Sequence, residues 1–133
     1  MTPLLCFTST FFATNVIVGL YLGYNVYAFL FFILMCTSLI NHSTYHPTIH
    51  TIDRMAIISV GIYGAYTMYH KQMWNVSFSN ALILFSFLFC VVMYEYGGRV
   101  QQFCFDPNPF VSLFYHACMH LVGSVSHHFI MLG

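Results

Sequence analysis

Five long apolar runs occupy most of the chain and limit what it can fold into. They cover about residues 3–22, 26–45, 51–70, 77–96 and 110–132. A helix needs about 20 predominantly apolar residues to cross a lipid bilayer, and each run has that length. Open sheet edges cannot sit in lipid, because their backbone groups would lack partners. The pattern predicts an all-α integral membrane bundle of about five transmembrane helices, forming a single domain over residues 1–133.

The scarcity of charge agrees with this prediction. Only 5% of the residues are charged, 59% are hydrophobic, and the mean hydropathy is +0.77. A soluble domain has about 25% charged residues, so this chain could not cover a water-facing surface. The formal net charge is zero, which argues against nucleic acid as a partner. The expected partners are the lipid bilayer and other membrane subunits or further copies of the chain.

Five polar residues are expected at a similar depth in this bundle, near the face that holds the N-terminus, here called face A. Ser38 and His42 end the second run, and Asp53 begins the third. His116 and His120 fall in the early turns of the fifth run, which also starts from face A. Ionisable residues inside membranes are costly, so they are candidates for a functional site.

The orientation of the bundle follows from its few positive charges. Arg54 and Arg99 are expected at face A, and Lys71 at the opposite face, here called face B. Positive residues prefer the cytoplasmic side. We therefore expect a multi-pass protein whose N-terminus lies on the cytoplasmic or matrix side.

The two histidines of the fifth run have the spacing of a metal-ligand pair. His116 and His120 are four residues apart, so on a helix their side chains share one face. His42 offers a third nitrogen from another helix, and three histidines plus water form the open pattern of a catalytic zinc site. A hydrogen-bonded packing pair is the alternative interpretation of His116 and His120.

Asp53 and Ser38 each have a structural interpretation as well. Asp53 is expected in the first turn of its helix, where a carboxylate favours the helix dipole, and it could pair with Arg54. A serine in a membrane helix commonly bonds to its own helix backbone. Ser38 nevertheless lies one turn before His42, on the same helix face.

The combined pattern resembles the CREST superfamily, which includes the alkaline ceramidases and the progestin and adipoQ receptors. The resemblance consists of Ser38-x3-His42, Asp53 eleven residues later, and His116-x3-His120, with IDRMAIISVGIYG around the aspartate. It covers about half of the chain. It implies a seven-helix fold, whereas this chain has five runs and lacks two helices before the last one. A partner or second copy would then complete the wall of a lipid cavity.

The resemblance also implies a function. His42, His116 and His120 would bind zinc near one membrane face. Asp53 would orient or deprotonate the zinc-bound water, and Ser38 would hydrogen-bond this water or the tetrahedral oxyanion. The expected activity is a ceramidase-like hydrolysis of a sphingolipid or other lipid.

Other interpretations remain open at this stage. The chain could be a small structural subunit of an organellar or viral membrane assembly that carries a relic metal site. A bis-histidine haem would leave Ser38 and Asp53 without a role, and a di-iron site would require HxxHH boxes that are missing here. Pro47 predicts a loop that contains His46 and His50. His127 and His128 are expected at the membrane interface of face B.

Overall fold

The computed structural model describes residues 2–133, and every regular element in that range is a helix. The prediction of an all-α fold is therefore confirmed for this part of the chain. In chain order the elements are α1 (Pro3–Ser9), α2 (Phe12–Tyr21), α3 (Asn25–Thr44), α4 (Pro47–His70), α5 (Phe78–Val91), the π-helix η1 (Val92–Tyr96), α6 (Gly97–Val100), the 3-10 helix η2 (Phe103–Phe105) and α7 (Pro109–Leu132).

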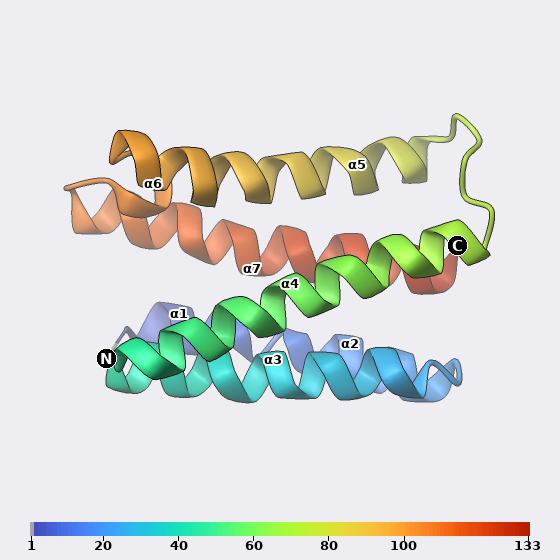
Figure 1. Cartoon of the computed structure of the whole chain (residues 1–133), viewed down its shortest axis with the longest axis horizontal. Coiled ribbons are helices and arrows are strands. Elements are labelled where there is room, and N and C mark those ends of the chain that lie inside the picture. Colours follow the sequence, from blue (N-terminus) through green and yellow to red (C-terminus); the bar gives the residue numbers. More distant parts are fainter. Residues whose placement is uncertain (1) are drawn as a thin grey trace.

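These helices form five rods that run back and forth along the long axis of the molecule (Figure 1). The N-terminus lies at face A and the C-terminus at face B. Helices α2 and α4 pack against α3, and helix α5 packs against α7. Because the rods alternate in direction, the end of α3, the start of α4 and the start of α7 all lie at face A. This arrangement places the residues singled out above at one end of the bundle.

The first apolar run is one rod with a break in its middle. Thr10 and Phe11 separate α1 from α2. The Thr10 hydroxyl donates to the Phe7 carbonyl oxygen at 2.6 Å. Such side-chain bonds to the preceding turn compete with the helix and often bend it.

The third rod begins earlier than expected, which corrects the predicted loop for His50, whereas His46 does lie in the short link between α3 and α4. Pro47 is the first residue of α4, where its missing N–H is not needed and its fixed φ suits a helix. His46 is the N-cap, and its Nδ1 accepts from the Thr48 backbone N–H at 3.3 Å. His50 consequently lies inside α4, with its side chain exposed.

The fourth rod also continues beyond its predicted end near residue 96. The pair Gly97 and Gly98 does not stop the helix, which reaches Val100 and ends at Gln101, where φ is 55°. Gly97 is required for another reason. A Cβ at this position would lie 2.7 Å from the Gln102 carbonyl oxygen, so only glycine lets the returning chain approach this closely.

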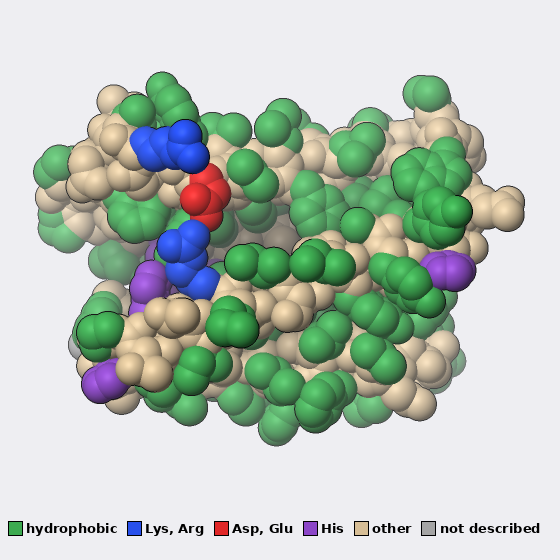
Figure 2. All heavy atoms as spheres, in the orientation of Figure 1, with side chains coloured by type: hydrophobic (Ala, Val, Ile, Leu, Met, Phe, Trp, Pro, Cys, Tyr) green, Lys and Arg blue, Asp and Glu red, His purple; other side chains and the backbone are tan. Residues whose placement is uncertain are grey.

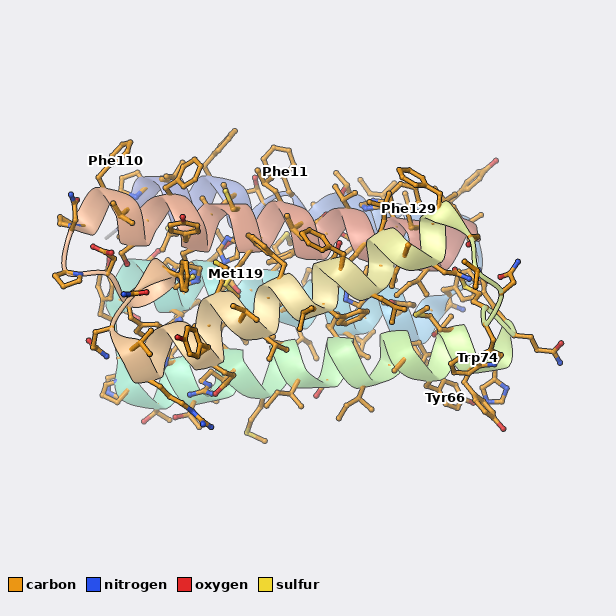
Figure 3. The ribbon with its side chains drawn as sticks, turned by 90° about the horizontal axis from the view of Figure 1, so that it is seen from above. Phe11, Tyr66, Trp74, Phe110, Met119 and Phe129 are labelled. Carbon is orange, nitrogen blue, oxygen red and sulfur yellow. The ribbon has the colours of Figure 1, made fainter. Side chains whose placement is uncertain are left out.

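Large apolar side chains cover the outside of the bundle. Figure 2 shows them spread over the face in view, with basic and acidic side chains grouped near face A. Phe11 and Phe110 project outward, and Tyr66 and Trp74 gather at face B, as expected of interfacial aromatic residues (Figure 3). An apolar surface of this extent marks contact with a membrane or with other proteins.

Three rods are long and apolar enough to cross a membrane: Pro3–Tyr21, Asn25–Thr44 and Phe78–Val100. This finding favours a membrane protein. The two other rods, α4 and α7, have 24 residues each and are long enough, but they are less apolar. Their lower hydropathy reflects the polar residues considered next.

Candidate metal centre

Three histidines from two helices meet near face A. His42 lies in the last turns of α3, and His116 and His120 occupy successive turns on one side of α7. Their ring centroids form a nearly equilateral triangle, with separations of 5.0, 5.0 and 5.3 Å. One ligand nitrogen from each ring lies within 4.8 Å of the other two. Nitrogens bound to one zinc ion are about 3.3 Å apart in tetrahedral geometry, so the rings need only draw together slightly.

The chemistry of this group fits a metal ion better than it fits simple packing. His42 is only 4% exposed, and its Nε2 is a buried nitrogen without a hydrogen-bond partner within residues 2–133. An unpaired buried polar group costs about 1–3 kcal/mol. A metal shared with the α7 histidines would satisfy this nitrogen. A bis-histidine haem would use only two of the three rings.

Thr8 fixes the orientation of one of these rings, and no local sequence pattern predicts this contact. Its hydroxyl lies 2.8 Å from Nδ1 of His120 and 3.2 Å from the Leu5 carbonyl oxygen. A hydroxyl has a single proton. If Thr8 donates it to Leu5, the threonine oxygen accepts from the His120 Nδ1–H. The Nε2 of His120 then keeps a free lone pair, which is what a metal ligand needs.

Asp53 lies beside the histidines but belongs to a separate hydrogen-bond cluster. Its side chain is 4% exposed. Oδ1 accepts from Ser38 at 2.7 Å and from Thr37 at 2.9 Å, and Oδ2 accepts from the Asn41 amide at 3.1 Å. All three donors come from the α3 segment that carries His42. The structure thus brings Ser38 and Asp53 together, while Asp53 is not among the residues that could share the metal with the three histidines.

Two structural interpretations of Asp53 and Ser38 are wrong. Asp53 is in the second turn of α4, whose first turn has no acidic residue, because α4 begins at Pro47. The helix dipole therefore does not explain Asp53. Its neighbour Arg54 pairs instead with Glu95 of η1 at 2.7 Å. Ser38 donates to the carboxylate of Asp53, and not to its own helix backbone.

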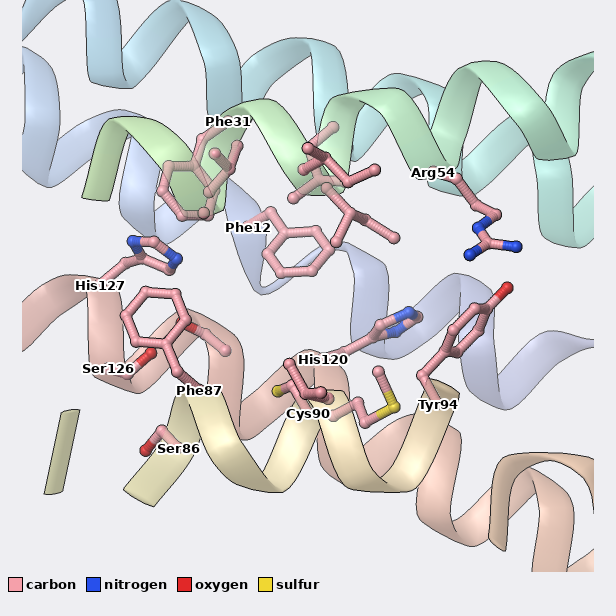
Figure 4. A pocket seen from close by; sticks show the side chains of 18 of the residues that line it. Phe12, Phe31, Arg54, Ser86, Phe87, Cys90, Tyr94, His120, Ser126 and His127 are labelled. Carbon is pink, nitrogen blue, oxygen red and sulfur yellow. The ribbon is translucent and has the colours of Figure 1, made fainter. Parts of the chain in front are cut away.

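A cavity of about 290 Å³ extends from His116 and His120 into the bundle. Its wall is mostly apolar and comes from α2, α3, α4, α5, η1 and α7. The surface in view is hollowed between α4 and α5 (Figure 2). Helix α4 packs mainly on α3, and α5 packs mainly on α7. Figure 4 shows Arg54 and Tyr94 at one end of the cavity, His127 at the other, and Phe12 and His120 between them.

The remaining histidines have different surroundings. His46 and His50 are exposed near face A, and the Tyr94 hydroxyl lies 3.4 Å from Nε2 of His50. The predicted interfacial position of His127 is wrong, because this side chain is 5% exposed. His128 is partly buried, and its Nδ1 lies 2.7 Å from the Ser124 carbonyl oxygen. His127 was misplaced because hydropathy does not reveal which side of a helix faces a cavity.

Comparison of the chain with protein-family models, with curated proteins and with solved structures found no match. The assignment of a function therefore depends on the geometry of the site and on the residue pattern of the chain.

Proposed function

We propose that the chain is a multi-pass membrane protein of five spans, with a zinc ion held by His42, His116 and His120, that hydrolyses an amide or ester bond of a lipid. The observation that carries this proposal is the convergence of three histidines, with Nε2 of His42 buried and unpartnered within residues 2–133 and with His116 and His120 on the wall of an apolar cavity. The resemblance of the residue pattern to the CREST superfamily supports the same function and suggests a ceramide-like substrate.

The distribution of polarity supports the membrane location. Apolar side chains such as Ile17, Phe29, Ile62 and Leu84 are about two-thirds exposed, whereas Asp53 is buried. A soluble protein has the opposite arrangement, because burying an ionisable group costs free energy and exposing it to water does not. We infer that lipid surrounds the outer face and that α4 and α7 also cross the bilayer. The N-terminus and Arg54 share face A, which favours a cytoplasmic or matrix location for that face.

The residues present fit zinc chemistry. Bound zinc supplies a Lewis acid that polarises a carbonyl and lowers the pKa of a bound water to near ~7. Three neutral imidazoles are ligands typical of such sites, and Thr8 would hold His120 in the required tautomer. Two of the three histidines, His116 and His120, lie on the wall of a cavity whose apolar lining suits an acyl chain.

Asp53 and Ser38 are the candidate residues for binding and deprotonating the nucleophilic water. The Oδ1 atom of Asp53 has two hydroxyl donors, whereas Oδ2 has a single amide donor from Asn41. Oδ2 therefore retains more capacity to accept a proton from a nucleophilic water. Arg54 and Glu95 at the cavity mouth are placed to meet the polar headgroup of a lipid.

One observation favours a second candidate function, a structural membrane subunit with a metal site and no turnover. The carboxylate of Asp53 already accepts three hydrogen bonds from α3. These bonds could serve only to tie α4 to α3 in the membrane. In that case partner subunits of an organellar or viral assembly would cover the apolar outer face.

Hydrolysis measurements separate these functions. The purified zinc-loaded chain is incubated with ceramide and with lipid esters, and released fatty acid is measured by mass spectrometry. The matched control replaces His42, His116 and His120 together by alanine. We expect fatty acid release from the wild type and none from the control. If the wild type, with zinc bound, cleaves none of these lipids, the structural subunit becomes the better proposal.

A further inference from the structure

The far end of the cavity holds a second polar group that the proposed hydrolysis does not use. His127 lines the cavity, and its Nδ1 is hydrogen-bonded to the Tyr27 hydroxyl of α3. No hydrogen bond joins its Nε2 to another group within residues 2–133, and this nitrogen is not fully buried, because the one fully buried side-chain nitrogen or oxygen without a partner in that range is Nε2 of His42. One ring nitrogen of His127 is directed into the cavity in Figure 4, toward Phe12. Nε2 is therefore open to the cavity, where a polar group of a ligand can reach it.

The surroundings of His127 are built to hold this ring in place. Tyr27, Phe31 and Phe87 meet it edge to face, with ring centroids 5.1–5.5 Å away. Gly64 of α4 leaves the space for it, because a Cβ there would lie 2.7 Å from Cε1 of His127. Residues from the three helices α3, α4 and α5 therefore fix one imidazole of α7 at the end of the cavity.

Two glycines on opposite walls keep open the passage between the metal-ligand histidines and His127. Gly123 lies on α7 between His120 and His127, and a Cβ added there would meet no atom within 4 Å. On the α4 side, a Cβ at Gly61 would approach only Cε1 of Phe87, at 3.9 Å. Both glycines line the cavity, so larger side chains at these positions would project into it.

We propose that His127 binds a hydroxyl group carried by the lipid chain, and that the preferred ligands are hydroxy-acyl lipids. A hydroxyl both donates and accepts, so it matches Nε2 in either tautomer. His127 follows His120 by two helical turns. Two turns rise about 10.5 Å, and an extended chain advances about 1.3 Å per bond, so about eight bonds, the separation of the carboxyl carbon from the ω-hydroxyl oxygen in an eight-carbon hydroxy acid, span this distance. This inference rests on the cavity being the lipid site of the proposed function, but it does not require turnover.

Binding of two matched probes tests the proposal. The zinc-loaded full chain in amphipol is titrated calorimetrically with octanoic acid and with ω-hydroxyoctanoic acid. We expect the hydroxy acid to bind about three- to tenfold more tightly, the range for one net hydrogen bond. His127→Phe should abolish this preference while it retains binding of octanoic acid. His70→Phe, at an exposed position of α4, is the control and should keep the preference.

The outcomes distinguish this proposal from the proposed function. Equal binding of both acids by the wild type, or a preference that survives His127→Phe, would overturn the hydroxyl site and leave the lipid cavity standing. If neither acid binds, the lipid cavity fails as well. Should His127→Phe not fold, His127→Leu removes the ring nitrogens with a smaller apolar side chain, and a preference for the hydroxy acid that survives in that variant contradicts the proposal. Gly123→Leu should weaken binding of both acids, because leucine would fill the passage.

Discussion

The Thr8 hydroxyl lies 2.8 Å from Nδ1 of His120, so a residue of the first rod orients a candidate metal ligand of the last rod. The two residues are 112 positions apart in the chain. Partners of this kind hold a ligating imidazole in one tautomer and one orientation. Thr8 is therefore the clearest test of whether the three histidines form a prepared metal site.

Thr8→Val should weaken zinc binding without removing any ligand. Valine keeps the shape of threonine but leaves Nδ1 of His120 without a partner. We expect about a 10- to 100-fold rise in the zinc dissociation constant, the usual effect of losing such a partner. Competition with a chromogenic chelator measures it. Ser9→Ala is the matched control, because the Ser9 hydroxyl donates only to the Leu5 carbonyl of its own helix, at 2.7 Å.

Removal of two histidine ligands should abolish zinc binding. The purified wild type should contain about one zinc per chain, because three histidine ligands with an open fourth position bind a single ion. The double variant His116→Ala, His120→Ala leaves only His42 and should contain almost none. Elemental analysis by mass spectrometry measures the content, with the exposed His70→Ala as control. Full zinc content in the double variant would contradict the assignment of His116 and His120 as zinc ligands.

Cysteine labelling should place residues 97–108 on the same side of the membrane as the N-terminus. In a chain without its natural cysteines, Gln102→Cys should react from face A and Val76→Cys from face B. Both positions are exposed, and the α5–α6 rod separates them. A membrane-impermeant maleimide applied to sealed vesicles of known orientation measures the side. Labelling of both positions from one side would contradict five spans.

Hydropathy predicted the course of the rods because a membrane-length helix must be apolar along its whole length. It predicted less well where those rods begin and end. Pro47 was interpreted as the end of a helix, but it begins α4, since proline is favoured at the first helical position. The fourth apolar run ends near residue 96, but the helix continues through Gly97 and Gly98 to Val100, and the close approach of the Gln102 carbonyl explains a glycine at position 97.

The sequence also left open which polar residues would meet. Helical spacing relates His116 to His120, and alternation of the rods relates both to His42, so the sequence suggested this group. Thr8 could not be predicted, because no local pattern joins it to α7. The burial of His127 had a usable signal: it follows His120 by two turns, which puts both on one side of α7. Arg54 of α4 pairs with Glu95 of η1. This ion pair depends on how the two helices face each other, and residue spacing along one helix cannot reveal that.

The last prediction concerns Asp53→Asn. If Asp53 accepts a proton during hydrolysis, this variant should keep nearly full zinc content, since the three imidazoles are unchanged. Turnover should fall on the order of 10²-fold or more, the range typical of losing a general acid–base group. The fold should tolerate the change. The new amide oxygen can accept from Asn41, and the new amide nitrogen can donate to the Ser38 and Thr37 hydroxyls, which accept as well as donate.

Because the fold should tolerate Asp53→Asn, this variant distinguishes a catalytic role of Asp53 from a structural role. If the carboxylate serves only to tie α4 to α3, Asp53→Asn should leave the hydrolysis rate close to that of the wild type. Thr37→Val is the matched control, because it removes one hydrogen bond to Oδ1 and keeps the charge. We expect it to lower stability by about 1 kcal/mol and to retain most of the activity. Rates, zinc content and thermal unfolding are compared for the three chains. Wild-type lipid hydrolysis by Asp53→Asn would show that this carboxylate is not the proton acceptor.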